Sequence, residues 1–486
     1  MGTVENVSKK SFCASSVENS KIFLLSYFQK SNIHGFVYFS LQVLSFLEKL
    51  FWLVLVVMAF SACVIISLQS YNRYETKNTV VTIEKDHYYW NTSMPSITIC
   101  PTVNRISIQK FDAYCEKKKI QGTDKSEFYQ FIESLANSTY TNFENIKDFP
   151  SIEKLNIDPK DYMSLIYRLT EDWSRRTEGE RKVRGIFDLE FVVTEQVLTE
   201  YGICYMTNNH LTKHLSTSTL IFGTEADSPF DEKFYQNVKL HQVVSGNLFD
   251  GDLNYNFVGF VDEIMLFVHS PYEAINIAKL SYYSNFAVEF HCFTNEIVTD
   301  ENFQAVTRVS QRGCRFQSES NLTHYNFYTK GICLQECRLN VAYRICSCIP
   351  HFYPNKVAAP KPVCSYKQLK TCLAKHKDLL VKLRDEMNNA VNCPGCVQNC
   401  KDVNIFIDSF QVLEGTTDLL GTIGGLMIVK QYPMIRYKRK ILFSFEDLIV
   451  SVGGTAGLFT GFCFLGAIEI IYFFTIRLFW YFKGRR

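Results

Sequence analysis

The feature that most constrains this chain is the apolar stretch over residues 450–478, which reads VSVGGTAGLFTGFCFLGAIEIIYFFTIRL. It is long enough to cross a bilayer, which takes about 20 helical residues. In its first half, Gly453, Gly457 and Gly461 recur at every fourth position, so they fall near one helix face. Small residues spaced in this way let helix backbones approach closely in lipid.

Polar groups within the same stretch separate two interpretations of it. Glu469 lies among apolar residues, and Thr455 and Thr460 add hydroxyl groups. An ionisable side chain in a membrane span is costly, and it normally faces a bundle interior or a water-filled path. The stretch is therefore either a self-associating anchor helix or a helix that lines a pore.

A second span is predicted over residues 50–70, because no charge falls between Lys49 and Arg73. Two spans place both termini on one side, and the basic residues beside the spans predict that this side is the cytosol. The predicted organisation is a cytosolic segment over 1–49, a span over 50–70, an extracellular domain over 71–447, a second span over 448–478 and a cytosolic tail over 479–486.

The cysteines agree with this topology. Of 17 cysteines, only Cys13, Cys63 and Cys463 lie outside residues 71–447, which leaves 14 in the predicted extracellular domain. An even number in an oxidising compartment predicts seven disulfides. Ten of the 14 cysteines lie within 314–400. The CxxC spacing there would also fit a zinc site or redox chemistry, but no matched histidines accompany it. Glycosylation sequons begin at Asn91, Asn137 and Asn321.

The extracellular domain reads as a mixture of strands and helices. Strands are predicted over 79–83, 96–100, 403–412 and 427–437, short strands between 187 and 298, and helices within 127–173 and 366–390. An acidic turn over 250–252 is a weak calcium candidate. Catalytic and phosphate-binding motifs are absent, so we expect no enzyme, cofactor or metal. A net charge of +2 without a basic stripe gives no indication of nucleic-acid binding.

These features together resemble the degenerin/epithelial sodium channel family, which includes the acid-sensing channels, with a spacing like that of the insect pickpocket branch. The residues that carry the resemblance are His34-Gly35, the string PSITICP over 95–101, the cysteine module over 314–400 and the glycine-rich segment over 453–463. The resemblance implies an α+β membrane protein: two transmembrane helices flank a disulfide-rich ectodomain with a β-sheet palm and a helical finger and thumb. It also implies a trimer with a central pore.

Roles carried over from the family fall on particular residues. Its Gly-x-Ser selectivity motif matches Gly461-Phe462-Cys463, where Cys463 lacks the hydroxyl oxygen of serine. The gating-sensitive position falls on Val450 or, with an offset of one residue, on Ser451. His34-Gly35 would form a re-entrant loop that affects gating. The expected pore-lining residues are Gly453, Gly454, Gly457, Thr460 and Glu469.

The family's nested pairing of thumb cysteines implies a set of disulfides here. They are Cys100–Cys204, Cys314–Cys400, Cys333–Cys396, Cys337–Cys393, Cys346–Cys372 and Cys348–Cys364, with Cys115–Cys292 left by elimination.

The predicted function is a voltage-independent cation channel of the plasma membrane, gated by a ligand or by force. The resemblance implies that it conducts sodium or other monovalent cations, is blocked by amiloride, and assembles in membrane lipid as a homo- or heterotrimer. A non-conducting two-span receptor for lipid or adhesion ligands remains an alternative, although it leaves the glycine stripe and Glu469 unexplained. An ATP-gated trimeric channel shares the topology but not this cysteine order.

Overall fold

The computed structural model divides the chain into two compact units. One holds Met1–Val80, Ser310–Arg312 and Lys440–Arg486, and the other holds Val81–Val309 and Gly313–Arg439. The structure describes residues 22–171, 182–184, 189–191, 194–222, 243–250, 253–260, 263–277, 281–284, 287–300, 302–384, 387–413 and 424–483. Cys13 and most of the acidic turn over 250–252 lie outside these ranges.

The first span is helix α3, Phe46–Thr76, in the first unit. Its start is fixed by a capping box, in which the Ser45 hydroxyl accepts from the Glu48 backbone N–H and the Glu48 carboxylate accepts from the Ser45 backbone N–H. None of its residues is buried within the chain, although its mean hydropathy reaches 2.7. A helix this apolar and this uncovered is suited to lipid, and it extends beyond the predicted 50–70 at both ends.

The second span is not one helix. It consists of α16, Phe445–Thr460, then α17, Phe464–Tyr472, a π-helical turn over Phe473–Arg477, and α18, Leu478–Lys483. Residues 461–463 between α16 and α17 are not helical. The continuous helix expected over 448–478 is thus divided after Thr460, because Gly461 takes the left-handed conformation that ends a helix.

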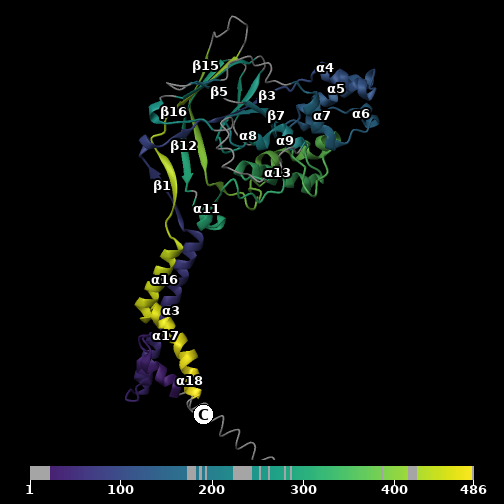
Figure 1. The fold of residues 1–486 in the computed structure, drawn as a ribbon. Helices are drawn as coiled ribbons and strands as arrows, with labels where there is room; N and C mark the ends of the chain where they lie inside the picture. The colour runs from purple at the N-terminus through teal and green to yellow at the C-terminus, as the bar shows by residue number, and fades with distance from the viewer. Residues whose placement is uncertain are drawn as a thin grey trace, which may run out of the picture. The chain divides into compact units, whose positions relative to one another are not determined.

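Helices α3 and α16 run side by side in Figure 1. Leu448 of α16 is buried, and the hydroxyl groups of Ser451 on α16 and Ser70 on α3 are hydrogen-bonded at 2.9 Å. The first unit therefore presents a helix pair above the break at 461–463.

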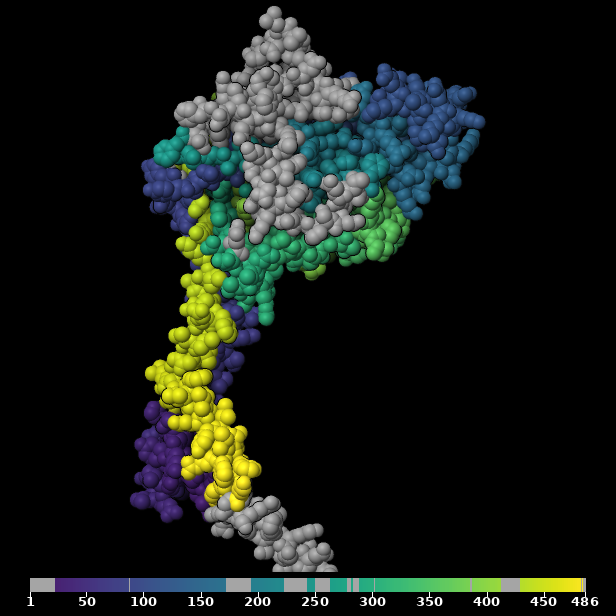
Figure 2. All heavy atoms as spheres, in the orientation of Figure 1, coloured from purple at the N-terminus to yellow at the C-terminus, as the bar shows by residue number. Residues whose placement is uncertain are grey.

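The segment before α3 folds back onto the second span. It forms a helix over residues 22–30 and the short helix α2, Phe36–Ser40. The Phe23 and Tyr27 rings are buried and lie 4.7 and 5.0 Å from the Phe473 ring. Figure 2 shows this N-terminal segment, in purple, against the yellow C-terminal helices. The aromatic contacts hold residues 22–45 beside the lower half of the second span.

The second unit contains two main sheets. The larger has the order β1-β17-β12-β16-β9-β4-β5, with β15 also paired to β12. Its strands are β1 Thr79–Glu84, β4 Lys182–Arg184, β5 Leu189–Phe191, β9 Leu253–Phe260, β12 Ala287–Thr299, β15 Asp402–Leu413, β16 Gly424–Gln431 and β17 Arg436–Ile441. The segment expected as one strand over 427–437 is two strands, since Pro433 between them cannot donate a ladder hydrogen bond.

The smaller sheet has the order β11-β10-β3-β7-β6. Its strands are β3 Ser96–Pro101, β6 Thr194–Thr199, β7 Gly202–Thr207, β10 Ile264–His269 and β11 Tyr282–Ser284. Strand β3 is buried along its whole length and pairs antiparallel with both β10 and β7. Two-stranded pairs join β13 Cys314–Arg315 to β14 Gln398–Asn399, and β2 Thr92–Ser93 to β8 Ser245–Gly246.

Helices cluster in two parts of this unit. The first group is α4 Ile108–Lys118, α5 Thr123–Ala136, α6 Pro150–Leu155 and α7 Tyr162–Leu169; the second, in the cysteine module, is α13 Lys330–Cys346, α14 Tyr366–Gln368 and α15 Lys377–Lys382. Short helices α8 Thr212–Leu215, α9 Thr217–Phe222, α11 Phe303–Val306 and α12 Val309–Arg312 complete the described set. One hydrophobic core joins the two groups, with the Phe131 and Tyr366 rings 5.8 Å apart.

The described residues form six disulfides, and these are six of the pairs that the family resemblance implies. They are Cys100–Cys204, Cys314–Cys400, Cys333–Cys396, Cys337–Cys393, Cys346–Cys372 and Cys348–Cys364. The predicted Cys115–Cys292 bridge is wrong, because both thiols are free. Cys115 is buried in the core of helices α4–α7, whereas Cys292 is buried in a separate core beneath strand β12.

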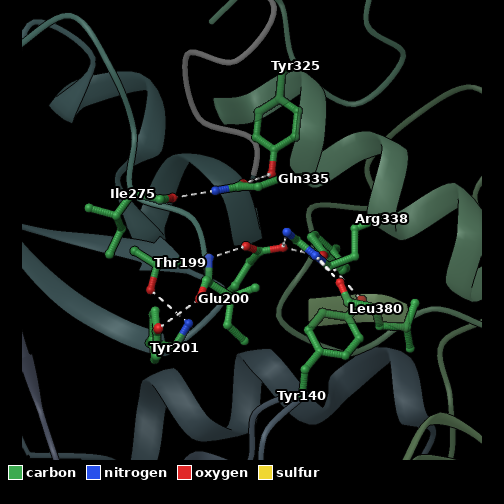
Figure 3. A network of polar contacts seen from close by, with 11 residues as sticks. Tyr140, Thr199, Glu200, Tyr201, Ile275, Tyr325, Gln335, Arg338 and Leu380 are labelled. Carbon is green, nitrogen blue, oxygen red and sulfur yellow. Dashed lines mark hydrogen bonds and ion pairs between the residues drawn. The ribbon is translucent and has the colours of Figure 1, made fainter. Parts of the chain in front are cut away.

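A buried ion pair fixes helix α13 (Figure 3). The Arg338 guanidinium on α13 contacts the carboxylate of Glu200, which lies in the turn between β6 and β7. That carboxylate also accepts from the Tyr353 hydroxyl at 2.6 Å and from the Ile277 backbone N–H at 2.9 Å. Arg338 donates in addition to the Leu380 carbonyl at 2.6 Å. Both charged groups thus have hydrogen-bond partners besides each other, which offsets the free-energy cost of burying the ion pair.

Candidate ion pathway

The non-helical residues 461–463 are the centre of the candidate site. Gly461 has φ +66°, and Cys463 is extended with φ −127° and ψ 173°. Among the residues that the structure describes, none donates a hydrogen bond to the carbonyl oxygens of Gly461 or Phe462. Lipid cannot satisfy such groups, so irregular backbone at this depth requires protein, water or ions around it. Two free carbonyls in a membrane span are chemically suited to hold a dehydrated cation.

His34 packs directly against this break. Its backbone N–H donates to the Thr460 carbonyl at 3.0 Å. A Cβ built on Gly461 would lie 2.5 Å from His34 Cδ2, a distance that real side chains do not tolerate. The break therefore needs glycine at position 461 for two reasons: the left-handed backbone and the approach of the imidazole.

Gly35 makes the corresponding contact with the first span. It has φ +92°, and a Cβ there would lie 2.5 Å from Val56 Cγ2 on α3. The two residues predicted to form a re-entrant loop, His34 and Gly35, thus lie between α3 and the C-terminal end of α16 in the same chain. They tie the end of α16 to α3 at the level of the break.

The glycine stripe of α16 faces away from α3. Within the described residues nothing lies within 4 Å of a Cβ built on Gly453 or Gly454, and the nearest atom to one on Gly457 is the Phe462 carbonyl oxygen at 3.8 Å. Val450 is 73% exposed on the outward side, whereas Ser451 bonds to Ser70. The small residues are therefore not explained by packing within the chain.

Thr460 and Cys463 lie on either side of the break. The Thr460 hydroxyl donates to the Ala456 carbonyl of its own helix at 2.7 Å, so its hydrogen is already committed. The Cys463 thiol is exposed and forms no disulfide. The Thr460 oxygen keeps its lone pairs for water or a cation, and the Cys463 thiol is exposed, so both side chains have an atom that can meet an ion.

Glu469 lies on α17, beyond the break. Its carboxylate Oε2 accepts from the Asn32 side-chain amide at 2.9 Å. Both residues line a cavity of about 200 Å³ whose walls also include Gly461, Lys30 and Arg477. A larger apolar cavity of about 590 Å³ lies between α3, α16 and the His34-Gly35 loop. Sequence reasoning singled out Glu469 but missed Asn32, since no motif marks an asparagine 437 positions away.

In the part of the chain that the structure describes, no metal centre competes with this site. Groups of three or more histidine, cysteine, aspartate or glutamate side chains that could hold a metal do not occur in the described ranges. The groups available to an ion are therefore the backbone carbonyls, the Thr460 hydroxyl and the Cys463 thiol at the break, and the Glu469 carboxylate on α17 beyond it.

Comparison of the sequence with known proteins shows to which family the chain is similar. The chain matches the model of the amiloride-sensitive sodium channel family over residues 27–473, which includes the His34-Gly35 loop, the first span and most of the second. It is similar to sodium channel protein Nach of Drosophila melanogaster, with 21% identity over 503 residues that cover 92% of this chain and 86% of Nach. Pickpocket protein 28 of the same species is 26% identical over 189 residues, 35% of this chain and 30% of that protein. Nach of Drosophila ananassae is 19% identical over 479 residues, 92% of this chain and 85% of that protein. These matches confirm the resemblance drawn from the motifs.

Proposed function

The chain belongs to the amiloride-sensitive sodium channel family, and from this membership and the geometry of the break we propose that it forms a trimeric, sodium-permeable cation channel. It acts in the plasma membrane with both termini in the cytosol, and it is blocked by amiloride. Its subunits are identical or closely related. Gating is independent of voltage and is driven by a ligand or by force on the extracellular domain.

The observation that carries the proposal is the pair of free carbonyls at Gly461 and Phe462. In a lone helix pair they would face lipid at high cost. Around a threefold axis, three such pairs would face a common path and replace part of the water shell of a cation. A non-conducting receptor has no use for this break, nor for glycines that the subunit itself leaves uncovered.

Residues 461–463 are the proposed selectivity filter. Because Cys463 has a thiol where relatives of the family place a serine hydroxyl, the ring of side-chain oxygens is lost while the carbonyls remain. Sulfur is a poor ligand for a hard cation such as Na⁺. We therefore expect cation conduction with weaker preference for Na⁺ over K⁺ than a serine at this position would give.

Val450 is the proposed gating-sensitive position, and its exposed outward side chain supports it over Ser451. Bulk at this site favours the open state in the family, so the channel leaks at rest. Force on the extracellular domain reaches both spans along the chain itself. Two residues separate the end of α3 from the start of β1, and three residues separate the end of β17 from the start of α16. Val450→Ala is expected to reduce the resting current.

Whole-cell recording with ion substitution tests the proposal. Cells that express the chain should carry a cation current whose reversal potential follows external Na⁺ and which amiloride reduces. Gly461→Val should abolish the current, because a branched side chain cannot occupy the space of the His34 ring. Protein that reaches the surface yet carries no cation current, alone or with related subunits, would overturn the proposal.

A further inference from the structure

The contact between Asn32 and Glu469 joins two segments that are far apart in the sequence. Asn32 lies two residues before His34, and Glu469 lies six residues after Cys463. The Asn32 amide Nδ2 donates to Glu469 Oε2 at 2.9 Å. This side-chain hydrogen bond is a second contact between the two segments, besides the backbone hydrogen bond from His34 N–H to the Thr460 carbonyl.

The partner of Glu469 is neutral, although cations are near. Lys30 and Arg477 line the same cavity of about 200 Å³, but within the described residues the partner of the Glu469 carboxylate is Asn32, and neither cation forms an ion pair with it. An amide orients a carboxylate without cancelling its charge, whereas a lysine or arginine would cancel it. The other oxygen, Oε1, accepts no hydrogen bond from any residue in the described ranges.

We propose that Asn32 is a positioning residue for the ion pathway: it holds the Glu469 carboxylate in one orientation and leaves its second oxygen without a hydrogen bond from the described residues, so that cations leaving the break meet it. This inference rests on the proposed channel function. Asn32 touches no ion itself and acts through Glu469. The orientation of Glu469 depends on the side chain at position 32, because the side-chain amide of Asn32, and not its backbone, makes the contact.

The test is a double-mutant cycle read out by ion selectivity and block. Inside-out patches give the affinity of Mg²⁺ applied from the side of the termini, and substitution of Na⁺ by K⁺ gives the permeability ratio. Asn32→Ala should weaken the Mg²⁺ block by about threefold or more, because a hydrogen bond to a charged acceptor is lost. It should move both readouts in the direction of Glu469→Gln, and it should have no further effect in a Glu469→Gln background.

Two further variants separate positioning from folding. Asn32→Gln keeps the amide and should restore most of the wild-type block. Asn32→Lys should neutralise the carboxylate and match or exceed the effect of Glu469→Gln. Ser26→Ala is the matched control, since the Ser26 hydroxyl donates to the nearby Phe23 carbonyl at 2.9 Å and Ser26 does not line the cavity; it should leave both readouts unchanged.

The outcomes distinguish the two proposals. A chain that carries no cation current overturns the channel function and this inference with it. A conducting channel in which Asn32→Ala and Glu469→Gln have independent, additive effects overturns the inference alone. So does a conducting channel in which neither substitution changes block or selectivity.

Discussion

Gly35 and Gly461 show how single residues set the geometry of the break. Each takes a positive φ, and each leaves room that another side chain fills: Val56 on α3 in one case and His34 in the other. Alanine at either position would add both backbone strain and a steric clash. The conformations of the loop and of the break therefore both require glycine, at positions 35 and 461.

At the same scale, Asn137 is an unsuitable glycosylation site once the protein has folded. Its amide Nδ2 donates to the Glu133 carbonyl at 2.9 Å, and its Oδ1 accepts from the Asn104 backbone N–H at 2.6 Å. Asn91 and Asn321 are exposed. We expect glycans at Asn91 and Asn321 and none at Asn137, which site mapping by mass spectrometry would check. A glycan on Asn137 in mature surface protein would contradict this.

Lys430 predicts a pH dependence of stability. The side chain is buried, and its ammonium donates to the Thr92 hydroxyl at 2.6 Å and to the Ser93 carbonyl at 2.8 Å. Burial lowers the pKa of Lys430 to about 8, against an opposing pull from Glu296. Between pH 8 and about 10.5 the unfolded lysine binds a proton that the folded one has released, so stability should rise with pH across that window, by up to about 3 kcal/mol.

Thermal unfolding of purified protein between pH 7 and 10 measures this effect. Lys430→Met should remove the rise, while Lys375→Met, a change to an exposed lysine, should keep it. An identical pH profile in wild type and Lys430→Met would count against the assignment.

Some of these residues could be predicted from the sequence, and others could not. The landmarks at His34-Gly35 and residues 461–463 follow from a motif, and the structure brings them into contact. The Cys115–Cys292 pairing failed because it assumed that every extracellular cysteine is oxidised, whereas a buried free cysteine behaves as a small apolar residue. Asn32 could not be found, since a single polar contact between distant segments has no sequence pattern.

At the scale of elements, the two spans differ in kind. Helix α3 is continuous and apolar on all sides, while the second span is divided at Gly461. The glycine spacing pointed to close packing, but the stop after Thr460 depends on the loop that supplies a hydrogen-bond donor to the Thr460 carbonyl. The pattern of apolar residues indicates which segments face lipid, but it does not predict a hydrogen bond from a distant loop.

The ion pair between Glu200 and Arg338 is a buried polar link of helix α13 to its surroundings (Figure 3). Removing one partner would leave a buried charge uncompensated, which costs about 3–5 kcal/mol. Arg338→Met should therefore lower the unfolding temperature and surface expression strongly. Adding Glu200→Gln should recover much of the loss, because the amide can still accept from Tyr353 and Ile277.

Lys367→Met is the matched control for this cycle. It removes an ion pair with Glu153 in which both side chains are more than half exposed, and such pairs contribute little. Additive losses from Arg338→Met and Glu200→Gln would show that the two residues do not act as a pair.

At the scale of the whole molecule, the glycine face of α16 has no packing partner among the described residues of the chain. Gly453 and Gly454 have no neighbour within 4 Å of an added Cβ in the described residues, so the subunit alone would tolerate larger side chains there. Close approach of three α16 helices would not. The proposed trimer would account for the glycines at these positions.

A size series at Gly453 tests this. Alanine, valine and leucine should leave the disulfides and glycans of the subunit intact, but they should progressively reduce the trimer fraction in detergent and the current. Crosslinking and native gel analysis measure the first, and recording measures the second. If Gly453→Leu assembles and conducts like wild type, the glycine face does not meet other subunits.

The most direct measurement of the central claim, that the break at residues 461–463 lies on the ion path, is block of current by a charged methanethiosulfonate reagent. Cys463 is an exposed free thiol at the break, and Cys63 on α3 is the control. The account predicts that the reagent blocks wild type and Cys63→Ser, and that Cys463→Ser is resistant and more selective for Na⁺. Equal block of wild type and Cys463→Ser, or wild-type current that persists after Cys463 is shown to be labelled, would contradict it.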